Sequence, residues 1–158
     1  MTSIQELIEK DAMEETKMKC LFLDDERMPE EVFEYTKNPI YMKEQWDIVK
    51  NYNEFVEYIQ NNGVPHIFSA DHDLKDVHYK TFLTPPTEIG KQEAWVEYHK
   101  QDSREKTGYD CLVWLTDYCY DNDKVFPNLL IHTMNQVGYN NMVFFYRNAV
   151  RNKFIKLA

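Results

Sequence analysis

The sequence predicts an α/β protein with a mainly parallel sheet of about four strands. Short apolar runs of strand character alternate along the chain with amphipathic stretches of helical period. The links between them are short, and a β-α-β order with short links favours parallel pairing. Several apolar runs end in ionisable or amide side chains, and ligands bind at that edge of an open parallel sheet. We therefore expect one polar site at the carboxyl ends of the strands.

The composition is that of one folded domain, expected over residues 18–158. The 158 residues are 43% hydrophobic and 15% aromatic, which is enough apolar material for a single core. The formal net charge of −9 argues against an extended nucleic-acid surface and against binding to an anionic membrane. It leaves room for a cation among the carboxylates, or for a small basic site that holds one phosphate.

The cysteines and the hydropathy pattern point to the cytoplasm. Cys20, Cys111 and Cys119 form no C-x-x-C pair, and an odd number leaves one unpaired in any disulfide scheme. Buried free thiols in a reducing compartment are the simpler interpretation. We find no secretory segment and no apolar run of membrane-spanning length, so we expect a cytoplasmic protein that binds no membrane.

The first half of the chain contains two expected strands and one expected helix. Residues 1–17 precede them as an acidic arm or a short helix. The first strand spans Lys19–Asp24, and Glu30–Ile40 is expected to form a loop or a broken helical turn. Trp46–Lys50 is the second strand candidate. A helix over Asn53–Asn62 follows, and a glycine ends it.

The second half repeats the pattern around a long polar stretch. The third strand spans 65–70, and residues 75–107 then read as an insertion that could cover the crevice as a lid. A helix is expected over Gly108–Tyr120 and a fourth strand over Leu129–Ile131. The last helix, Gly138–Phe154, carries a broad apolar stripe.

Asp24 and Asp25 follow the first strand directly. Both carboxylates can face one crevice only if the strand stops there, and the nearby Pro29 makes a stop plausible. If Asp71 reaches the same crevice, the sheet edge holds an oxygen-rich site suited to Mg²⁺ or Mn²⁺. The alternative is an ordinary acidic turn on the surface. Asp24, Asp25 and Asp71 are thus the candidate metal ligands.

His72 and Asp73 complete the polar end of the third strand. A histidine there could act as general base near neutral pH, or it could bind a transition metal. It could also do no more than hydrogen-bond a loop. The acidic neighbours on both sides and the preceding apolar strand favour a catalytic role, with Asp73 beside it.

The fourth strand ends in His132, close to the expected start of the last helix. A helix N-terminus offers unpaired N–H groups and a positive dipole end, where phosphate binds readily. We expect His132 to protonate a leaving oxygen and Asn135 or Asn140 to donate to the phosphoryl group, although Asn135 could simply form the turn. Arg27 is either a phosphate clamp with a planar fork or a surface arginine paired with an acid.

Four motifs lie at the ends of these expected elements: L-F-L-D-D-E-R-x-P, S-A-D-H-D-L, G-Y-D-x-x-x-W-L and I-H-T-M-N-x-x-G-x-x-N-M. Together they resemble the cyclic-phosphate-processing receiver-like domain family, which is related to the receiver domains of two-component signalling. The match runs from about Lys19 to about Met142, with residues 75–107 interrupting it. It therefore covers most of the chain.

The resemblance implies a flavodoxin-like, three-layer α/β sandwich with an acidic pocket at the strand ends. In receivers, two acids after the first strand and an aspartate after the third bind Mg²⁺ and accept a phosphoryl group. Asp24, Asp25 and Asp71 stand at the matching positions. The chain departs from receivers by adding two histidines and an aspartate at this edge, and by lacking a fifth strand with its lysine.

These departures favour the processing of a phosphate ester over reversible phospho-signalling. The resemblance implies a metal-assisted or histidine-dependent phosphoesterase that opens a cyclic phosphate on a small molecule, a nucleotide derivative or an RNA end. The alternative is a non-catalytic receiver-like module that binds phosphate, a cyclic nucleotide or a protein partner. The sequence identifies neither the substrate nor a protein partner.

Overall fold

A computed structural model describes residues 3–4, 18–74 and 106–158 of the chain. Its elements are, in order, β1 (Cys20–Leu23), α2 (Pro29–Thr36), α3 (Ile40–Lys43), β2 (Trp46–Val49), α4 (Tyr52–Asn62), β3 (Ile67–Ala70), α7 (Gly108–Asp121), β4 (Asn128–Ile131) and α8 (Gln136–Arg151). Strands and helices alternate, as the sequence predicted. Most of the N-terminal arm and nearly all of the insertion lie outside the described residues, so both remain predictions.

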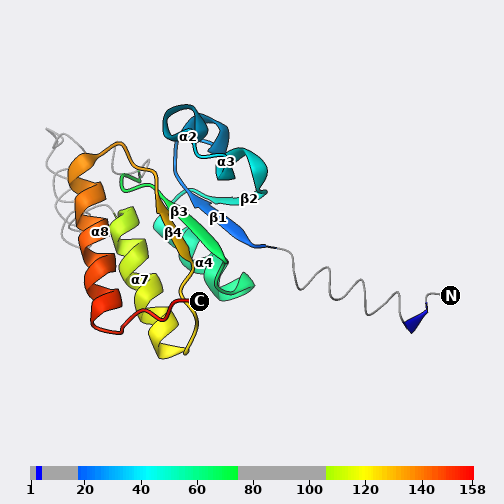
Figure 1. Ribbon diagram of the computed structural model, residues 1–158, viewed down its shortest axis with the longest axis vertical. Coiled ribbons are helices and arrows are strands. Elements are labelled where there is room, and N and C mark those ends of the chain that lie inside the picture. Colours follow the sequence, from blue (N-terminus) through cyan, green and yellow to red (C-terminus); the bar gives the residue numbers. More distant parts are fainter. Residues whose placement is uncertain (1–2, 5–17, 75–105) are drawn as a thin grey trace, which may run out of the picture.

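The described strands form a four-stranded sheet in the order β2-β1-β3-β4, and every pairing in it is parallel. Phe22 of β1 stands opposite Ser69 of β3, which stands opposite Leu130 of β4. The two central strands, β1 and β3, are buried at every residue. Parallel pairing brings the carboxyl ends of β1, β3 and β4 to the same edge of the sheet (Figure 1).

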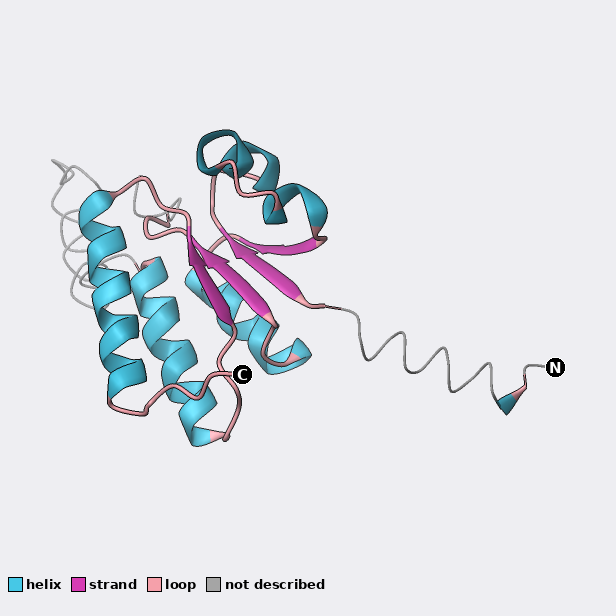
Figure 2. Ribbon diagram, in the orientation of Figure 1, coloured by secondary structure: helices cyan, strands magenta, loops and turns pink. Residues whose placement is uncertain are grey.

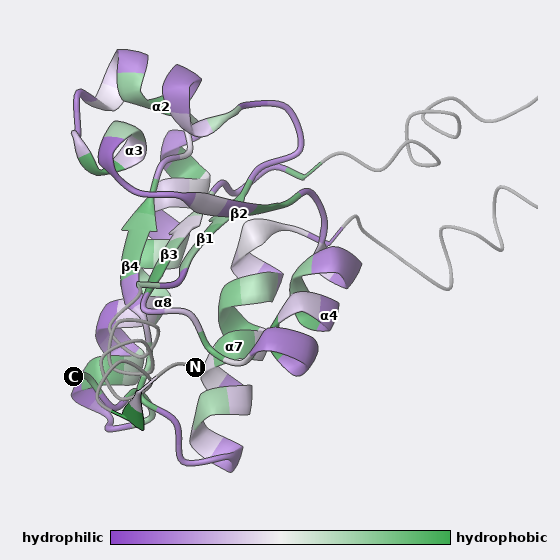
Figure 3. Ribbon diagram, turned by 90° about the vertical axis from the view of Figure 1, so that its right-hand side faces the viewer, coloured by the Kyte–Doolittle hydropathy of each residue, from purple (hydrophilic) through white to green (hydrophobic). Residues whose placement is uncertain are grey.

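Helices cover both faces of the sheet, which gives a three-layer sandwich (Figure 2). On one face, α4, α7 and α8 pack over a large core that includes Leu21, Leu23 and Phe68. On the other face, α2 and α3 enclose a smaller cluster around Phe22 and Tyr41. Side chains alternate along a strand, so β1 supplies both cores. Hydrophobic residues dominate β1, β3 and β4 in Figure 3. The flavodoxin/receiver-like α/β fold is thereby confirmed.

The segment expected to be a loop or a broken helical turn is instead a regular helix, α2. Pro29 occupies its first turn, where the missing N–H costs nothing. The Glu31 carboxylate accepts a hydrogen bond from the Met28 amide (3.3 Å), and two acidic side chains face the positive end of the helix dipole. The helix ends at Lys37 in a left-handed conformation. The stretch is too short and too acidic to show an apolar repeat of helical period. The features that predict this helix are the proline and the acidic residues at its start.

The last helix begins two residues before Gly138, the residue at which it was expected to start. α8 starts at Gln136, and Gly138 lies inside its first turn. Asn135 is the N-cap, and its Oδ1 accepts a hydrogen bond from the Gly138 amide at 3.0 Å. One of the N–H groups that was expected to bind phosphate is therefore already used within the chain.

The helices are amphipathic rather than apolar on all sides. α8, with 16 residues, buries Met142 and Ala149 and leaves Phe144 and Arg147 exposed. In the described parts of the chain, no helix combines the length and the apolarity needed to cross a lipid bilayer.

The three cysteines are free and buried, as expected. Burial raises the pKa of Cys20 to about 11 and that of Cys119 to about 11, and it raises the pKa of Cys111 as well. We predict that a disulfide reagent at pH 8 labels the native protein at least ~100-fold more slowly than the urea-unfolded protein, because few native thiols are ionised. Labelling should accelerate as the pH approaches 11. Fast labelling of any one native thiol at pH 8 would contradict this prediction.

Candidate functional site

The polar ends of β1, β3 and β4 meet at the carboxyl edge of the sheet. The Asp71 amide donates to the Leu23 carbonyl (2.9 Å), and the His132 amide donates to the Ala70 carbonyl (3.0 Å). The hydrogen-bonded ladder thus continues one residue past β3 and β4 and carries these side chains forward together. Asp24 directly follows β1; its Oδ2 lies 3.0 Å from His132 Nε2, and one of its oxygens lies within 4.8 Å of an Asp71 oxygen. The predicted convergence of the three strand ends is confirmed.

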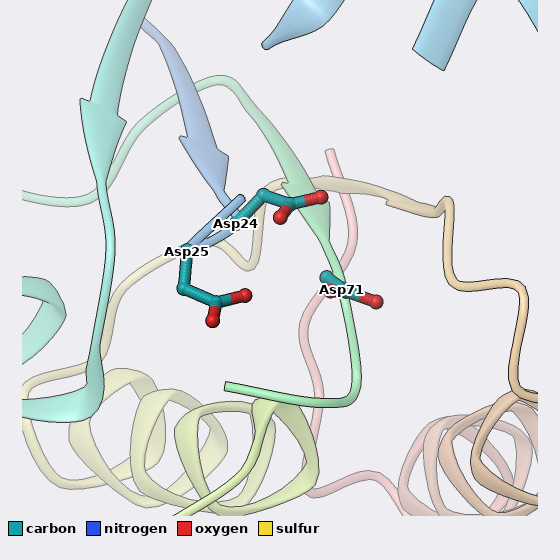
Figure 4. Close-up of side chains that lie close together, drawn as sticks. All are labelled: Asp24, Asp25 and Asp71. Carbon is teal, nitrogen blue, oxygen red and sulfur yellow. The ribbon is translucent and has the colours of Figure 1, made fainter. Parts of the chain in front are cut away.

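Asp24, Asp25 and Asp71 form an acidic cluster at this edge (Figure 4). One carboxylate oxygen from each lies within 4.8 Å of the other two. Asp24 and Asp71 are buried, with 1% and 4% of their surface exposed, and Asp25 is half-buried. Three carboxylates this close repel one another, and a divalent cation that prefers oxygen ligands would offset the repulsion. The structure therefore brings all three predicted metal ligands together.

The two buried carboxyl groups of the cluster have opposite pKa shifts. Burial raises the pKa of Asp71, and the negative charge of Asp24 raises it further, although a hydrogen bond with Thr133 opposes the change. Burial acts on Asp24 too, but hydrogen bonds from His132 and from two backbone amides outweigh it and lower the pKa of Asp24. Of these two buried carboxyl groups, Asp71 is thus the one whose charge the protein compensates less.

Asp24 is held through both of its oxygens. Oδ1 accepts hydrogen bonds from the amides of Glu26 and Arg27, each at 2.9 Å. This turn ends β1 and explains why the strand stops where the two acids begin. Oδ2 accepts a hydrogen bond from His132 Nε2 at 3.0 Å. One lone pair, on Oδ2, remains for a further contact.

His72 and Asp73 directly follow Asp71 in the chain and form a hydrogen-bonded pair. His72 Nδ1 lies 2.9 Å from Asp73 Oδ1, and the two side chains are 17% and 59% exposed. Because a carboxylate only accepts hydrogen bonds, Nδ1 carries the hydrogen and Nε2 is the basic nitrogen. Among the described residues, no hydrogen-bond partner of Nε2 is found.

Asn135 supports this pair from the start of α8. Its Nδ2 donates to both Asp73 oxygens at 3.2 Å, while its Oδ1 caps the helix at Gly138. Both ends of the amide are therefore engaged within the protein. The expectation that Asn135 binds phosphate stays a prediction, and these contacts favour a role in holding Asp73.

Two glycines allow α7 and α8 to approach the end of β3. A Cβ atom on Gly108 would lie 1.7 Å from the Asp71 carbonyl oxygen, and one on Gly138 would lie 2.4 Å from Cγ of the His72 ring. The Gly108 amide also donates to the His72 carbonyl at 2.7 Å. Sequence reasoning treated both glycines as helix starts only. Their occurrence in the first turn of two helices, where glycine is otherwise unfavourable, was the available signal.

His132 lies inside the protein and not in the crevice. Its ring is 0% exposed, and it stacks on Phe22 with 4.6 Å between ring centroids. Nδ1 lies 2.7 Å from Ser69 Oγ, and Nε2 contacts Asp24. The Tyr35 hydroxyl donates to the His132 carbonyl. Both ring nitrogens are occupied, so these contacts do not favour the expected donation of a proton to the substrate. They favour a role in holding Asp24.

Three hydroxyl-bearing residues of the site were missed by sequence reasoning. Thr133 hydrogen-bonds Asp71, Ser69 contacts His132, and the Tyr41 hydroxyl lies 2.7 Å from Ser69 Oγ. Ser69 had a recognisable signal, because a polar residue inside a buried strand must find a hydrogen-bond partner. Thr133 directly follows a strand-end histidine. Nothing in the local sequence around Tyr41 indicates a link to the site.

Arg27 and Asn140 differ in their suitability for binding phosphate. Arg27 Nη2 contacts Met134 Sδ at 3.4 Å, and the guanidinium carbon lies 5.9 Å from the centroid of the Tyr35 ring. Among the described residues no carboxylate pairs with Arg27, so its guanidinium retains donors for a phosphate. Asn140 is exposed on α8, where its Oδ1 accepts a hydrogen bond from Gln136 at 2.9 Å. The roles of both residues stay predictions.

A cavity of about 520 Å³ opens beside His72, between the first turn of α7 and one side of α8. Its walls combine aromatic rings, amides and two hydroxyl groups: His72, Thr107, Tyr109, Asn141, Phe144, Phe145 and Asn148. Pockets of this size and mixed character commonly hold small organic ligands. His72 lines the cavity and directly follows Asp71 of the acidic cluster.

Residues 19–148 match the family described as the cyclic-phosphate processing receiver domain. The chain belongs to this family. The matched stretch contains all four strands and every candidate site residue. No curated protein and no solved structure matches the chain. The family description links a receiver domain to cyclic-phosphate processing.

Proposed function

We propose that the protein is a phosphoesterase that opens a cyclic phosphate at the carboxyl edge of its sheet. The observation that carries the proposal is the pair of His72 and Asp73, which leaves His72 a basic nitrogen and directly follows Asp71, one of three carboxylates with oxygens within 4.8 Å of one another. The carboxylates alone would suit a phospho-accepting receiver. The added pair of His72 and Asp73 supplies acid–base chemistry that phosphate-ester hydrolysis requires.

Asp24, Asp25 and Asp71 would hold a divalent cation, for which we propose Mg²⁺ or Mn²⁺. The described cluster offers only carboxylate oxygens, without sulfur or imidazole, and such a set suits these hard ions. The poorly compensated charge of Asp71 supports the same assignment. When bound, the cation would polarise the phosphoryl oxygens.

His72 would act as the general base. Its Nε2 would take a proton from the attacking water, while Asp73 keeps the hydrogen on Nδ1 and Asn135 holds Asp73. The water oxygen bonds to phosphorus as one ring P–O bond breaks, and the leaving oxygen takes a proton from solvent. Arg27, whose guanidinium pairs with no carboxylate among the described residues, would bind the phosphoryl oxygens.

The substrate we propose is a phosphorylated small molecule or an RNA end that carries a cyclic phosphate. The cavity beside His72 would take the organic group attached to the phosphate. A net charge of −9 supports contact with one phosphate group rather than an extended nucleic-acid surface. We further propose that the protein works in the cytoplasm, since three free buried thiols fit a reducing compartment.

A non-catalytic receiver-like module is the second candidate function, and the burial of His132 favours it. With that ring enclosed, only one histidine of the described site is placed to exchange protons with a substrate. Phosphorus NMR of 2′,3′-cyclic mononucleotides and other cyclic phosphates, with and without chelator, separates the two candidates. Conversion to a phosphomonoester supports the enzyme, whereas binding without conversion supports the module.

We predict that Mn²⁺ stabilises the protein through the acidic cluster. At a free concentration of 100 times Kd, the free energy of unfolding should rise by about 2.7 kcal/mol. Asp71→Asn keeps the shape of the side chain but removes a ligand charge, so it should abolish most of this gain and lower turnover at least ~10-fold. Asp121→Asn, on an exposed position of α7, is the matched control and should change neither. Thermal unfolding with and without Mn²⁺ measures the gain.

The chelator series tells the cation and the histidine apart. Turnover that survives excess chelator would overturn the cation assignment and leave the role of His72 standing. An unfolding temperature that Mn²⁺ raises equally in wild type and in Asp71→Asn would place the cation elsewhere.

A further inference from the structure

A chain of buried hydrogen bonds leads from helix α3 to the acidic cluster. Tyr41 Oη lies 2.7 Å from Ser69 Oγ, Ser69 Oγ lies 2.7 Å from His132 Nδ1, and His132 Nε2 lies 3.0 Å from Asp24 Oδ2. These four residues are 4%, 0%, 2% and 1% exposed, respectively. These hydrogen bonds join the smaller core beneath α2 and α3 to the acidic cluster at the carboxyl edge of the sheet.

The groups in this series of hydrogen bonds can all be satisfied only if the hydrogens are donated in one direction along it. The carboxylate of Asp24 can only accept, so Nε2 of His132 carries a hydrogen. Nδ1 then accepts from the Ser69 hydroxyl, and Ser69 accepts from the Tyr41 hydroxyl. In the opposite direction, the hydroxyl hydrogen of Tyr41 would have no acceptor among the described residues. When each group donates to the next, from Tyr41 through to Asp24, every buried hydrogen in the series therefore has an acceptor.

Two neighbouring aromatic rings hold the His132 ring in the orientation that these hydrogen bonds require. Phe22 stacks on it with an interplanar angle of 4°, and Tyr41 meets it edge-on at 82°. Asp24 Oδ1 is occupied by two backbone amides, so the hydrogen bond from His132 decides how the remaining lone pair of Oδ2 is directed. That lone pair is the one left for a cation.

We propose that Tyr41 and Ser69 are positioning residues for the cation site, because they fix the tautomer of His132 that donates to Asp24. They touch neither the cation nor the substrate and act through the His132 ring alone. This inference rests on the proposed cation at the acidic cluster. Carboxylates that hold metal ions are commonly oriented by such outer hydrogen bonds, whose loss weakens metal binding by about 10–100-fold.

The test compares Tyr41→Phe and Ser69→Ala with wild type in protein labelled with ¹⁵N at histidine. Nitrogen shifts and two-bond couplings of the imidazole report the tautomer and need no metal. We expect the Nε2–H tautomer for His132 in wild type and a mixture of tautomers in Ser69→Ala. Mn²⁺ binding, followed by electron paramagnetic resonance, should weaken about tenfold in both variants.

Tyr58→Phe is the matched control, because the Tyr58 hydroxyl also donates to another side chain, the Asp47 carboxylate at 2.5 Å, but away from the site. It should leave the His132 signals and Mn²⁺ affinity unchanged, even if it lowers the unfolding temperature. An Nδ1–H tautomer in wild type, or unchanged Mn²⁺ affinity in both variants, would overturn the proposal. If wild type binds no Mn²⁺, the proposed function loses its cation, and the tautomer in the two variants still decides whether Tyr41 and Ser69 fix the ring.

Discussion

Replacement of His72 by alanine should lower kcat for cyclic-phosphate hydrolysis by about 10²–10⁴-fold, the usual contribution of a general base. The His72 side chain is partly exposed, and its Nε2 has no hydrogen-bond partner among the described residues, so it can exchange protons with a substrate. Its removal takes away the proton acceptor but leaves the three carboxylates in place. Mn²⁺ affinity should therefore stay the same, so the loss belongs to the chemical step.

Asp73→Asn refines this prediction. The amide of asparagine can donate to His72 Nδ1, which would move the hydrogen to Nε2 and leave no basic nitrogen for the water. Its kcat should fall nearly as far as that of His72→Ala, although the geometry is kept.

His66→Ala is the control for the loss of an imidazole. His66 is exposed, precedes β3 and accepts a hydrogen bond from the Lys19 amide at the amino end of the sheet, opposite the site. This variant should keep kcat. Full activity in His72→Ala, with the protein still folded, would refute the assigned base. Phosphorus NMR at saturating substrate measures kcat for all three variants.

The convergence of Asp24, Asp71 and His132 was predictable because parallel strands end at a common edge, whatever the rest of the chain does. Hydrophobic runs located the strands, and the residue that follows each run had to lie at that edge. The number of layers followed from the alternation of strands and helices. Both features follow from backbone geometry once the strands are located, and a single sequence is enough to locate them.

The burial of His132 was not predictable in the same way. Whether a strand-end side chain points into the crevice or back into the core depends on the partners it meets across the sheet. Here the partners are Phe22, Ser69 and Asp24, which come from two other strands. Helix α2 was missed for a local reason, since capping and a proline rather than an apolar stripe specify it.

Gly108→Ala should destabilise the protein by about 3 kcal/mol or more, at the upper end of the usual cost of overpacking. Helix propensity alone predicts the opposite sign, because alanine favours helices over glycine by about 1 kcal/mol. The steric effect should win because the added Cβ would lie 1.7 Å from the Asp71 carbonyl oxygen, which belongs to the backbone and cannot rotate away. The start of α7 or the end of β3 must then shift, and with it the Asp71 carboxylate and the Mn²⁺ affinity.

Gly138→Ala provides the comparison, because its Cβ would meet the His72 ring and not the backbone. The His72 side chain can move away by rotation about χ1, which gives up its contact with Asp73, so this variant should keep most of its stability and its Mn²⁺ affinity while losing kcat. Urea unfolding and Mn²⁺ titration of both variants measure the difference. Equal stability of Gly108→Ala and wild type would mean that the start of α7 does not approach the end of β3 this closely.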